Sequence, residues 1–160
     1  MMEQFIIEIP ERLWSETIEG LRKRSKGREA ACIWGGYRRP GVQEVKEVFF
    51  LDDLVGVKGF ARRHNVPRVA LDQLFEMLRD KKLSIIADLH THPGAWVGLS
   101  PVDMSHPLEY RIGMIMAVIP YYAAMSIGLG NIGVHEYHGS GRWRKLPPQK
   151  VKEKIKIIGC

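Results

Sequence analysis

The uncharged stretch from Ile112 to Val134 constrains the fold most, because it is long and apolar enough to cross a lipid bilayer. Pro120 interrupts it near its middle, several glycines follow, and Ser126 and Asn131 would place polar groups within the lipid. Two buried β-strands joined by a turn account for the same residues. We therefore predict two core strands here and no membrane span.

The rest of the composition is that of an ordinary globular protein. The chain has 160 residues, of which 45% are hydrophobic and 26% charged, and we expect a single domain over residues 1–160. Cys32 and Cys160 are the two cysteines, so we expect neither a disulfide framework nor a thiolate zinc cluster. The first residues do not resemble a secretory signal. We expect a cytoplasmic protein.

The net charge of +6 is concentrated in three basic runs. These are residues 22–28 ("RKRSKGR"), residues 142–145 ("RWRK") and the alternate lysines between positions 150 and 156. Such runs could attract an acidic protein, a nucleic acid or a phosphate surface. For each run taken singly, we favour a solvated surface that keeps the protein in solution.

Apolar periodicity predicts the elements of the first half. A helix should begin at Pro10 and end before Gly27. Strands are expected over residues 29–37 and 42–51, separated by a Pro-Gly turn. Residues 52–67 lack periodicity, so we expect a long surface loop, which is often functional. The face that the helix should bury consists of Leu13, Trp14, Thr17, Ile18 and Leu21.

The second half should continue with a helix from Arg68 to about Lys82 and a strand over residues 83–90. We expect a short helix after Asp103, then the two apolar strands, then a hairpin around the Gly-Ser-Gly turn at 139–141. In the tail, lysines alternate with mostly apolar residues over 150–157. This period of two favours an edge strand, and a frayed helix is the alternative.

Two histidines lie at the end of the strand predicted over residues 83–90. Side chains on a strand alternate between its faces, so His90 and His92 project to one side, and Leu89 and Thr91 to the other. Pro93 cannot continue a central strand and forces a loop. The strand therefore directs two imidazoles toward one point.

The loop after Pro93 leads to "SPVD", residues 100–103, which has the pattern of a helix start. Ser100 fits the N-cap, a proline fits the first helical position, and Asp103 fits the third. A capping box alone would explain this tetrapeptide. Beside His90 and His92, however, one carboxylate with an open fourth position fits a catalytic zinc site.

A zinc site of this kind needs a base, because the ion lowers the pKa of bound water to about 7 but a carboxylate must still carry the proton. Glu29 is the best candidate, since it opens an otherwise apolar strand. A solvated strand end after Arg28 is the alternative. The remaining polar candidates have ordinary interpretations: a hydrogen-bonding role for Asp88, and exposed or edge-strand positions for His106, His135 and His138.

The spacing of His90, His92, Ser100 and Asp103, with Glu29 upstream, resembles the signature of the JAMM (MPN-plus, JAB-type) zinc metalloproteases of the prokaryotic type. The resemblance covers most of the chain. It implies an α/β fold of the α+β kind: one MPN domain with a mixed, mostly antiparallel sheet flanked by helices, similar to cytidine deaminases. It further implies that His90, His92 and Asp103 ligate Zn²⁺, that Glu29 is the general acid and base, and that Ser100 stabilises the oxyanion.

The resemblance also implies a substrate, namely a peptide or isopeptide bond at the C-terminus of a ubiquitin-like or sulphur-carrier-like protein. Cys32 and Leu99 depart from the family pattern, which often has glycine and proline there. Trp96 lies in the loop between His92 and Ser100, where it could contact substrate or pack in the core. The sequence leaves the oligomeric state open.

Two other functions are alternatives to the peptidase. A noncatalytic MPN scaffold is one, although such scaffolds typically lack the ligands that this chain has. A RadC-like, nucleic-acid-associated protein is the other, but those proteins usually carry asparagine where this chain has Thr91, and we do not expect nucleic acid as a partner. An amidohydrolase barrel also uses His-x-His, but 160 residues are too few for eight strand-helix units.

Overall fold

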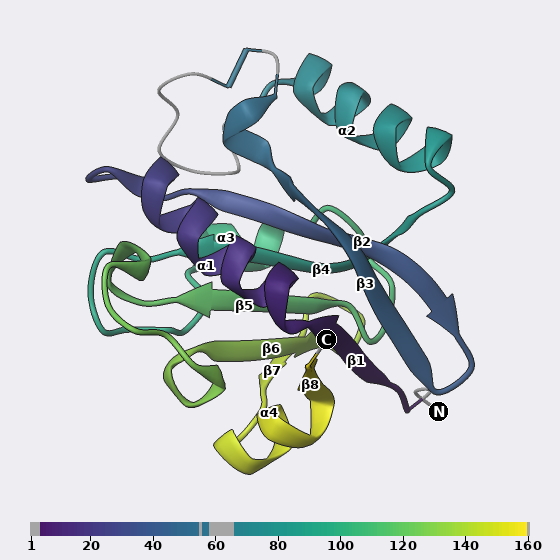
Figure 1. The fold of residues 1–160 in the computed structure, drawn as a ribbon, viewed down its shortest axis with the longest axis vertical. Coiled ribbons are helices and arrows are strands. Elements are labelled where there is room, and N and C mark those ends of the chain that lie inside the picture. The colour runs from purple at the N-terminus through teal and green to yellow at the C-terminus, as the bar shows by residue number, and fades with distance from the viewer. Residues whose placement is uncertain (1–3, 55, 58–65, 160) are drawn as a thin grey trace.

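The fold is built on one curled sheet, seen in a computed structural model that describes residues 4–54, 56–57 and 66–159 (Figure 1). The described residues form an eight-stranded sheet in the order β7-β6-β5-β4-β2-β3-β1-β8. Four strand pairs are antiparallel and three are parallel. The predicted fold class, a mixed and mostly antiparallel sheet with flanking helices, is confirmed.

Most predicted elements are present within a few residues of their expected bounds. The strands are β1 (Ile6–Pro10), β2 (Ala31–Arg39), β3 (Val42–Phe50), β4 (Ser84–Thr91), β5 (Ile115–Ile119), β6 (Gly133–Tyr137), β7 (Trp143–Lys145) and β8 (Ile155–Ile158). The helices are α1 (Glu11–Ser25), α2 (Arg68–Asp80), α3 (Pro101–Ser105) and α4 (Pro148–Lys154), with 3₁₀ turns η1 (Leu51–Asp53), η3 (Tyr121–Ala123) and η4 (Leu129–Asn131).

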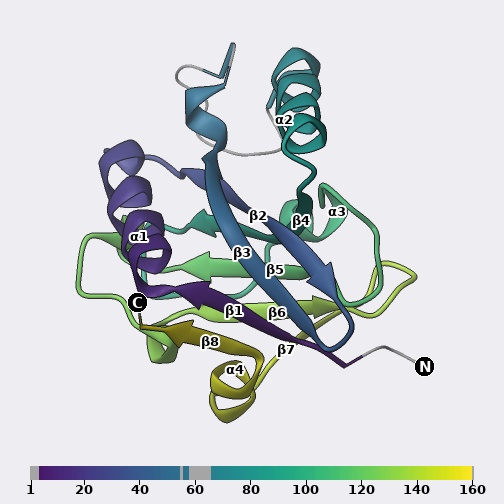
Figure 2. The ribbon, with the colours of Figure 1, turned by 45° about the vertical axis from the view of Figure 1, so that its right-hand side comes forward.

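The sheet separates two apolar cores. On one face, the buried side of α1 packs around Trp34, whose indole N–H donates to Thr17 Oγ1 at 2.9 Å. On the other face, Leu74 and Leu78 of α2 pack against Ile33. Figure 2 shows α1 and α2 on different sides of β2 and β3. Strands β2, β4 and β5 therefore lie in the interior, where a side chain at a strand end is held rigidly.

The apolar stretch over 112–134 contains two neighbouring buried strands, as predicted. Strands β5 and β6 pair antiparallel. The connection between them is not the short turn that we expected, because it includes both η3 and η4. Within the described part of the chain, no helix is long and apolar enough to span a membrane.

The tail differs from its predicted strand over 150–157. Two prolines begin α4, since proline suits the first turn of a helix, and only β8 adds an edge strand, parallel to β1. Val151 and Lys154 lie three residues apart and are both buried. That spacing matches one face of a helix. The lysine alternation therefore belongs partly to a helix and partly to a strand.

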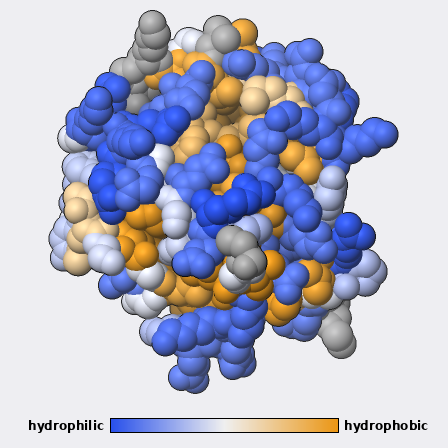
Figure 3. Space-filling model, viewed as in Figure 1, coloured by the Kyte–Doolittle hydropathy of each residue, from blue (hydrophilic) through white to orange (hydrophobic). Residues whose placement is uncertain are grey.

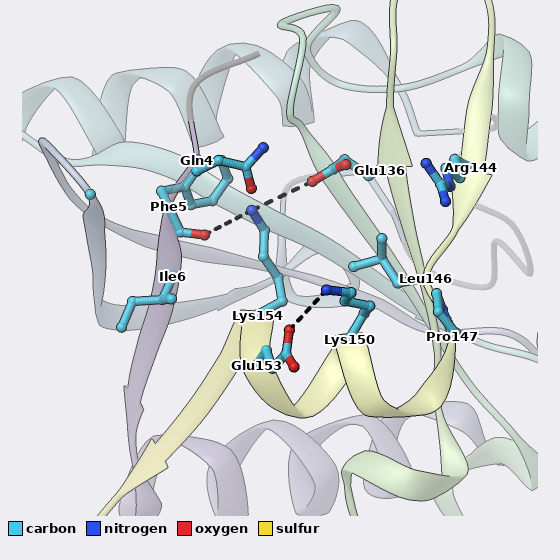
Figure 4. Close-up of a pocket in the computed structure, with 11 residues that line it drawn as sticks. Gln4, Phe5, Ile6, Glu136, Arg144, Leu146, Pro147, Lys150, Glu153 and Lys154 are labelled. Carbon is cyan, nitrogen blue, oxygen red and sulfur yellow. Dashed lines mark hydrogen bonds and ion pairs between the residues drawn. The ribbon is translucent and has the colours of Figure 1, made fainter.

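Lys154 closes the gap between the N-terminal end of β1 and strand β6. Its Nζ donates to Phe5 O at 2.9 Å and lies 3.5 Å from Glu136 Oε2, at the base of a pocket of about 450 Å³ (Figure 4). Burial lowers the pKa of Lys154, and Glu136 partly offsets this effect.

The predicted short helix is α3, which contains Asp103 rather than following it. The predicted loop over 52–67 begins with η1, and its residues 58–65 lie outside the described residues, as does Cys160. Cys32 is a buried free thiol.

Candidate functional site

The site lies at the C-terminal end of β4, where the chain delivers both histidines of the motif. His90 and His92 are 2% and 7% exposed. Their Nε2 atoms lie 3.1 Å apart. The prediction that the two imidazoles share one side of the strand is confirmed. Strand β4 pairs with β2 and β5 on its two sides, so neighbouring strands fix the direction of both imidazoles.

Asp103 joins the two imidazoles from the first turn of α3. Its Oδ2 lies 3.3 Å from His90 Nε2 and 3.5 Å from His92 Nε2. The same oxygen accepts a hydrogen bond from the Ser100 N–H at 2.9 Å, while the Asp103 N–H donates to Ser100 Oγ at 3.1 Å. The predicted capping box is therefore present, and it directs the carboxylate toward the histidines.

The electrostatics of this cluster favour positive charge between the three side chains. Burial alone would raise the pKa of Asp103, but hydrogen bonds with His90 and His92 lower it well below its usual range. Burial alone would lower the pKa of His92, yet the Asp103 carboxylate and the Trp96 carbonyl raise it overall. Groups that stabilise a protonated imidazole also stabilise a metal cation at the same place.

The tautomer of His92 follows from its backbone contact. Its Nδ1 lies 3.0 Å from Trp96 O. A carbonyl can only accept, so Nδ1 carries a proton, and in the neutral imidazole that binds a metal Nε2 keeps its lone pair. A backbone carbonyl in this role is a common way to orient a metal-binding histidine. His92 therefore presents its lone pair to the space shared with His90 and Asp103.

These three side chains fit a tetrahedral zinc ion. Zinc bonds of 2.0–2.2 Å to nitrogen and oxygen place neighbouring ligand atoms about 3.3–3.5 Å apart. The three separations of 3.1, 3.3 and 3.5 Å among His90, His92 and Asp103 agree with that spacing. Two imidazole nitrogens and one carboxylate oxygen are also donors that zinc prefers.

Glu29 borders the same cluster. One ligand atom from each of Glu29, His90 and His92 lies within 4.8 Å of the others, an arrangement that could itself hold a metal ion. Two carboxylates therefore approach the paired imidazoles, Asp103 from α3 and Glu29 from the segment just before β2. The short contacts of Asp103 with both imidazoles favour it as the ligand.

A buried hydroxyl network, absent from the expectations above, holds the chain that follows Glu29. Thr91 Oγ1 accepts from the Ala30 N–H at 2.9 Å and lies 3.0 Å from Ser25 Oγ. The Thr91 N–H donates to Ala30 O, also at 2.9 Å. Thr91 and Ser25 are fully buried. A hydroxyl between two histidines on a buried strand is the signal that could have shown this link.

The loop between His92 and Ser100 is anchored to β6. His135 Nε2 lies 2.9 Å from Val97 O, and a Cβ added at Gly133 would lie only 2.0 Å from that oxygen. Burial lowers the pKa of His135, so the neutral imidazole donates this bond. The expectation of an exposed or edge-strand His135 is wrong, because it is buried on β6.

His106 is exposed, and His138 lies 3.0 Å from Glu136 Oε1, apart from the motif.

A pocket of about 190 Å³ opens onto the cluster. Trp96 forms one wall, because its ring stacks on His92 with centroids 5.3 Å apart and remains 60% exposed. Of the two expectations for Trp96, packing in the core is wrong. The pocket is lined by Glu29, His92, Pro93, Trp96, Ser100, Val102 and Asp103.

Comparison with known proteins adds a relative and two similar structures. No protein-family model matches the chain. Over 137 residues it is 21% identical to "Probable metalloprotease y4jG" from Sinorhizobium fredii, a match covering 82% of this chain and 81% of that protein. The structure resembles that of protein DSY2949 from Desulfitobacterium hafniense (TM-score 0.65, 15% identity, 97% and 93% of the two chains). It also resembles AF2198, a JAB1/MPN domain protein from Archaeoglobus fulgidus (TM-score 0.50, 14% identity, 98% and 100%).

Proposed function

We propose that the chain is a zinc-dependent peptidase or isopeptidase of the JAMM/MPN family, which its motif, its fold and its metalloprotease relative support. The observation that carries the proposal is the cluster of His90, His92 and Asp103, whose donor atoms lie at the spacing of zinc ligands. In this role, the three side chains would hold the ion, and the pocket that opens onto them would admit solvent and substrate.

When bound, zinc would supply a Lewis acid that polarises the scissile carbonyl and makes water acidic near neutral pH. Glu29 borders the pocket, so its carboxylate can accept a proton from the attacking water. It then passes that proton to the leaving amine, as a general acid. A group that first accepts and then donates a proton must stay close to both atoms, which explains why the chain after Glu29 is fixed by Thr91.

Ser100 suits the stabilisation of the oxyanion. Its Oγ accepts from the Asp103 N–H, but a hydroxyl has one proton of its own and can donate it elsewhere. Ser100 lines the same pocket as Glu29. A donor aimed at developing negative charge is worth about 3 kcal/mol in the transition state.

For the substrate, we propose the C-terminal tail of a ubiquitin-like or sulphur-carrier-like protein, in the cytoplasm. The pocket supports a slender tail, because about 190 Å³ beside the Trp96 ring leaves little room for a large side chain. Residues without bulky side chains on both sides of the scissile bond would fit this space.

The test is incubation of the zinc-loaded protein with ubiquitin-like fusions, with and without a chelator, followed by intact mass measurement. We expect cleavage after the C-terminal residue of the ubiquitin-like part, and none with the chelator. Glu29→Gln is the matched control, because it keeps the three ligands but removes the base; it should bind zinc and not cleave. A zinc-bound wild type that cleaves none of the fusions would favour the noncatalytic scaffold instead.

A further inference from the structure

A left-handed turn, η3, with an uncommon backbone is hydrogen-bonded to the loop that contains His92 and Gly94. Tyr121, Tyr122 and Ala123 have φ values of 55°, 54° and 60°. Residues other than glycine pay about 1–2 kcal/mol each in this conformation and rarely adopt it in succession. Such strain persists only where surrounding contacts impose it, and it tends to lie at functional sites.

Contacts on three sides hold this turn against the site. The Tyr121 N–H donates to Gly94 O at 3.1 Å, and the Tyr122 N–H donates to His92 O at 2.9 Å. The Tyr122 hydroxyl donates to Gly27 O at 3.3 Å. Arg22 Nε donates to Ala123 O at 2.6 Å. The turn therefore connects the histidine loop with the segment that leads to Glu29.

The outer surface of this region combines exposed aromatic rings with cations. Tyr121 is 43% exposed and Trp96 is 60% exposed. Lys23 is exposed in the last turn of α1, and Lys26 and Arg28 are exposed on the connection from α1 to β2. Figure 3 shows hydrophilic side chains over the C-terminal end of α1. We call these five residues, of which Trp96 lines the pocket, the rim.

We propose that the rim is the docking surface for the folded body of an acidic protein substrate. Aromatic and arginine side chains are enriched at protein interfaces, where rigid rings provide the central contacts. Segment 22–28 contains no acidic residue. Arg22 and Arg24 pair with Glu19 and Asp53, and the exposed Lys23, Lys26 and Arg28 complement a negatively charged partner. The strained turn that carries Tyr121 contacts this segment through the Tyr122 hydroxyl, which donates to Gly27 O. The inference rests on the proposed function, since it assigns the substrate's body to a surface next to the peptidase pocket.

The test separates docking from chemistry by the size of the substrate. The probes are an acidic ubiquitin-like domain fused to a reporter, and a synthetic peptide that contains only the residues around the same scissile bond. Lys23→Glu/Lys26→Glu and Tyr121→Ala should each lower kcat/KM for the fusion about tenfold. They should leave kcat/KM for the peptide within about twofold, because the pocket is unchanged.

The matched control is Lys152→Glu/Lys156→Glu, which makes the same charge change on α4 and β8. It should leave both substrates unaffected, whereas added salt should slow cleavage of the fusion by wild type more than by the rim variants. Equal loss in the rim and control variants, or equal loss on fusion and peptide, would overturn the docking surface.

Binding of the intact fusion to zinc-loaded Glu29→Gln, measured by calorimetry, distinguishes this proposal from the proposed function. Binding that is weakened by the rim changes, with no cleavage by wild type, would refute the peptidase alone. Cleavage by wild type with binding unchanged in the rim variants would refute the rim alone.

Discussion

The buried hydroxyl of Thr91 makes a prediction that can be worked out from the structure. Thr91→Val keeps the shape of the side chain but removes the acceptor of the Ala30 N–H and the partner of Ser25 Oγ. A buried polar group left without its partner costs about 1–3 kcal/mol. With two such groups, we expect the free energy of unfolding to fall by about 2–6 kcal/mol. That is a large part of the total for a domain of this size.

Thr91→Ser is the matched control, because it keeps the hydroxyl and loses one buried methyl group. That loss should cost about 1 kcal/mol. In the double variant Ser25→Ala/Thr91→Val, one of the two orphaned groups is gone, so its destabilisation should be smaller than the sum of the single changes.

Denaturant unfolding of the zinc-loaded and the chelated protein measures these differences, and hydrogen exchange at the Ala30 amide reports the bond itself. We expect fast exchange in Thr91→Val and protection in wild type and Thr91→Ser. Zinc content should be retained, while peptidase activity falls in Thr91→Val and recovers in Thr91→Ser. A Thr91→Val protein as stable as Thr91→Ser, with the Ala30 amide still protected, would refute the reasoning.

Three further changes test other parts of the structure. His92→Ala should lose both zinc and cleavage, because two donors cannot hold the ion tightly; undiminished zinc by metal analysis would contradict the ligand assignment. Gly133→Ala places a Cβ against Val97 O, so the loop must shift. Thermal unfolding should show that the free energy of unfolding falls by about 1–3 kcal/mol, and kcat/KM should fall too. Wild-type values of both would show that the loop is free to adjust. Lys154→Met leaves Phe5 O and Glu136 without their buried donor. Denaturant unfolding should show that the free energy of unfolding falls by about 1–3 kcal/mol. An unchanged midpoint would show that the contacts of Lys154 do not contribute to stability.

The parts of the site that depend on local geometry were predictable from the sequence. The two-residue period of a strand places His90 and His92 on one side, and the serine, proline and aspartate of "SPVD" specify their own capping box. The buried face of α1 follows in the same way from helical spacing. In each case the residues that determine the structure are close together in the chain.

Other parts depend on contacts between distant segments, which one sequence does not reveal. The approach of Glu29 to the histidines requires β2 to pair with β4, and the link between Ala30 and Thr91 exists only in that pairing. His135 is buried because the loop at Val97 folds over it. The left-handed turn at Tyr121 contains no glycine that would have signalled it.

The C-terminal tail shows a third limit of prediction from sequence. Its alternating lysines fit a strand, yet the prolines before it favour a helix start, and Lys154 is buried because it bridges Phe5 and Glu136. The pattern of charge alone could not decide between these structures, since the bridging partners lie on β1 and β6, far away in sequence.

X-ray absorption at the zinc edge, measured on the wild type and on Asp103→Ala, tests the central claim most directly. We predict one zinc ion per chain, bound by two imidazole nitrogens, one carboxylate oxygen and one solvent oxygen, with the zinc affinity strongly reduced in Asp103→Ala. A fourth protein ligand in place of solvent, or an unchanged zinc site in Asp103→Ala, would contradict the account.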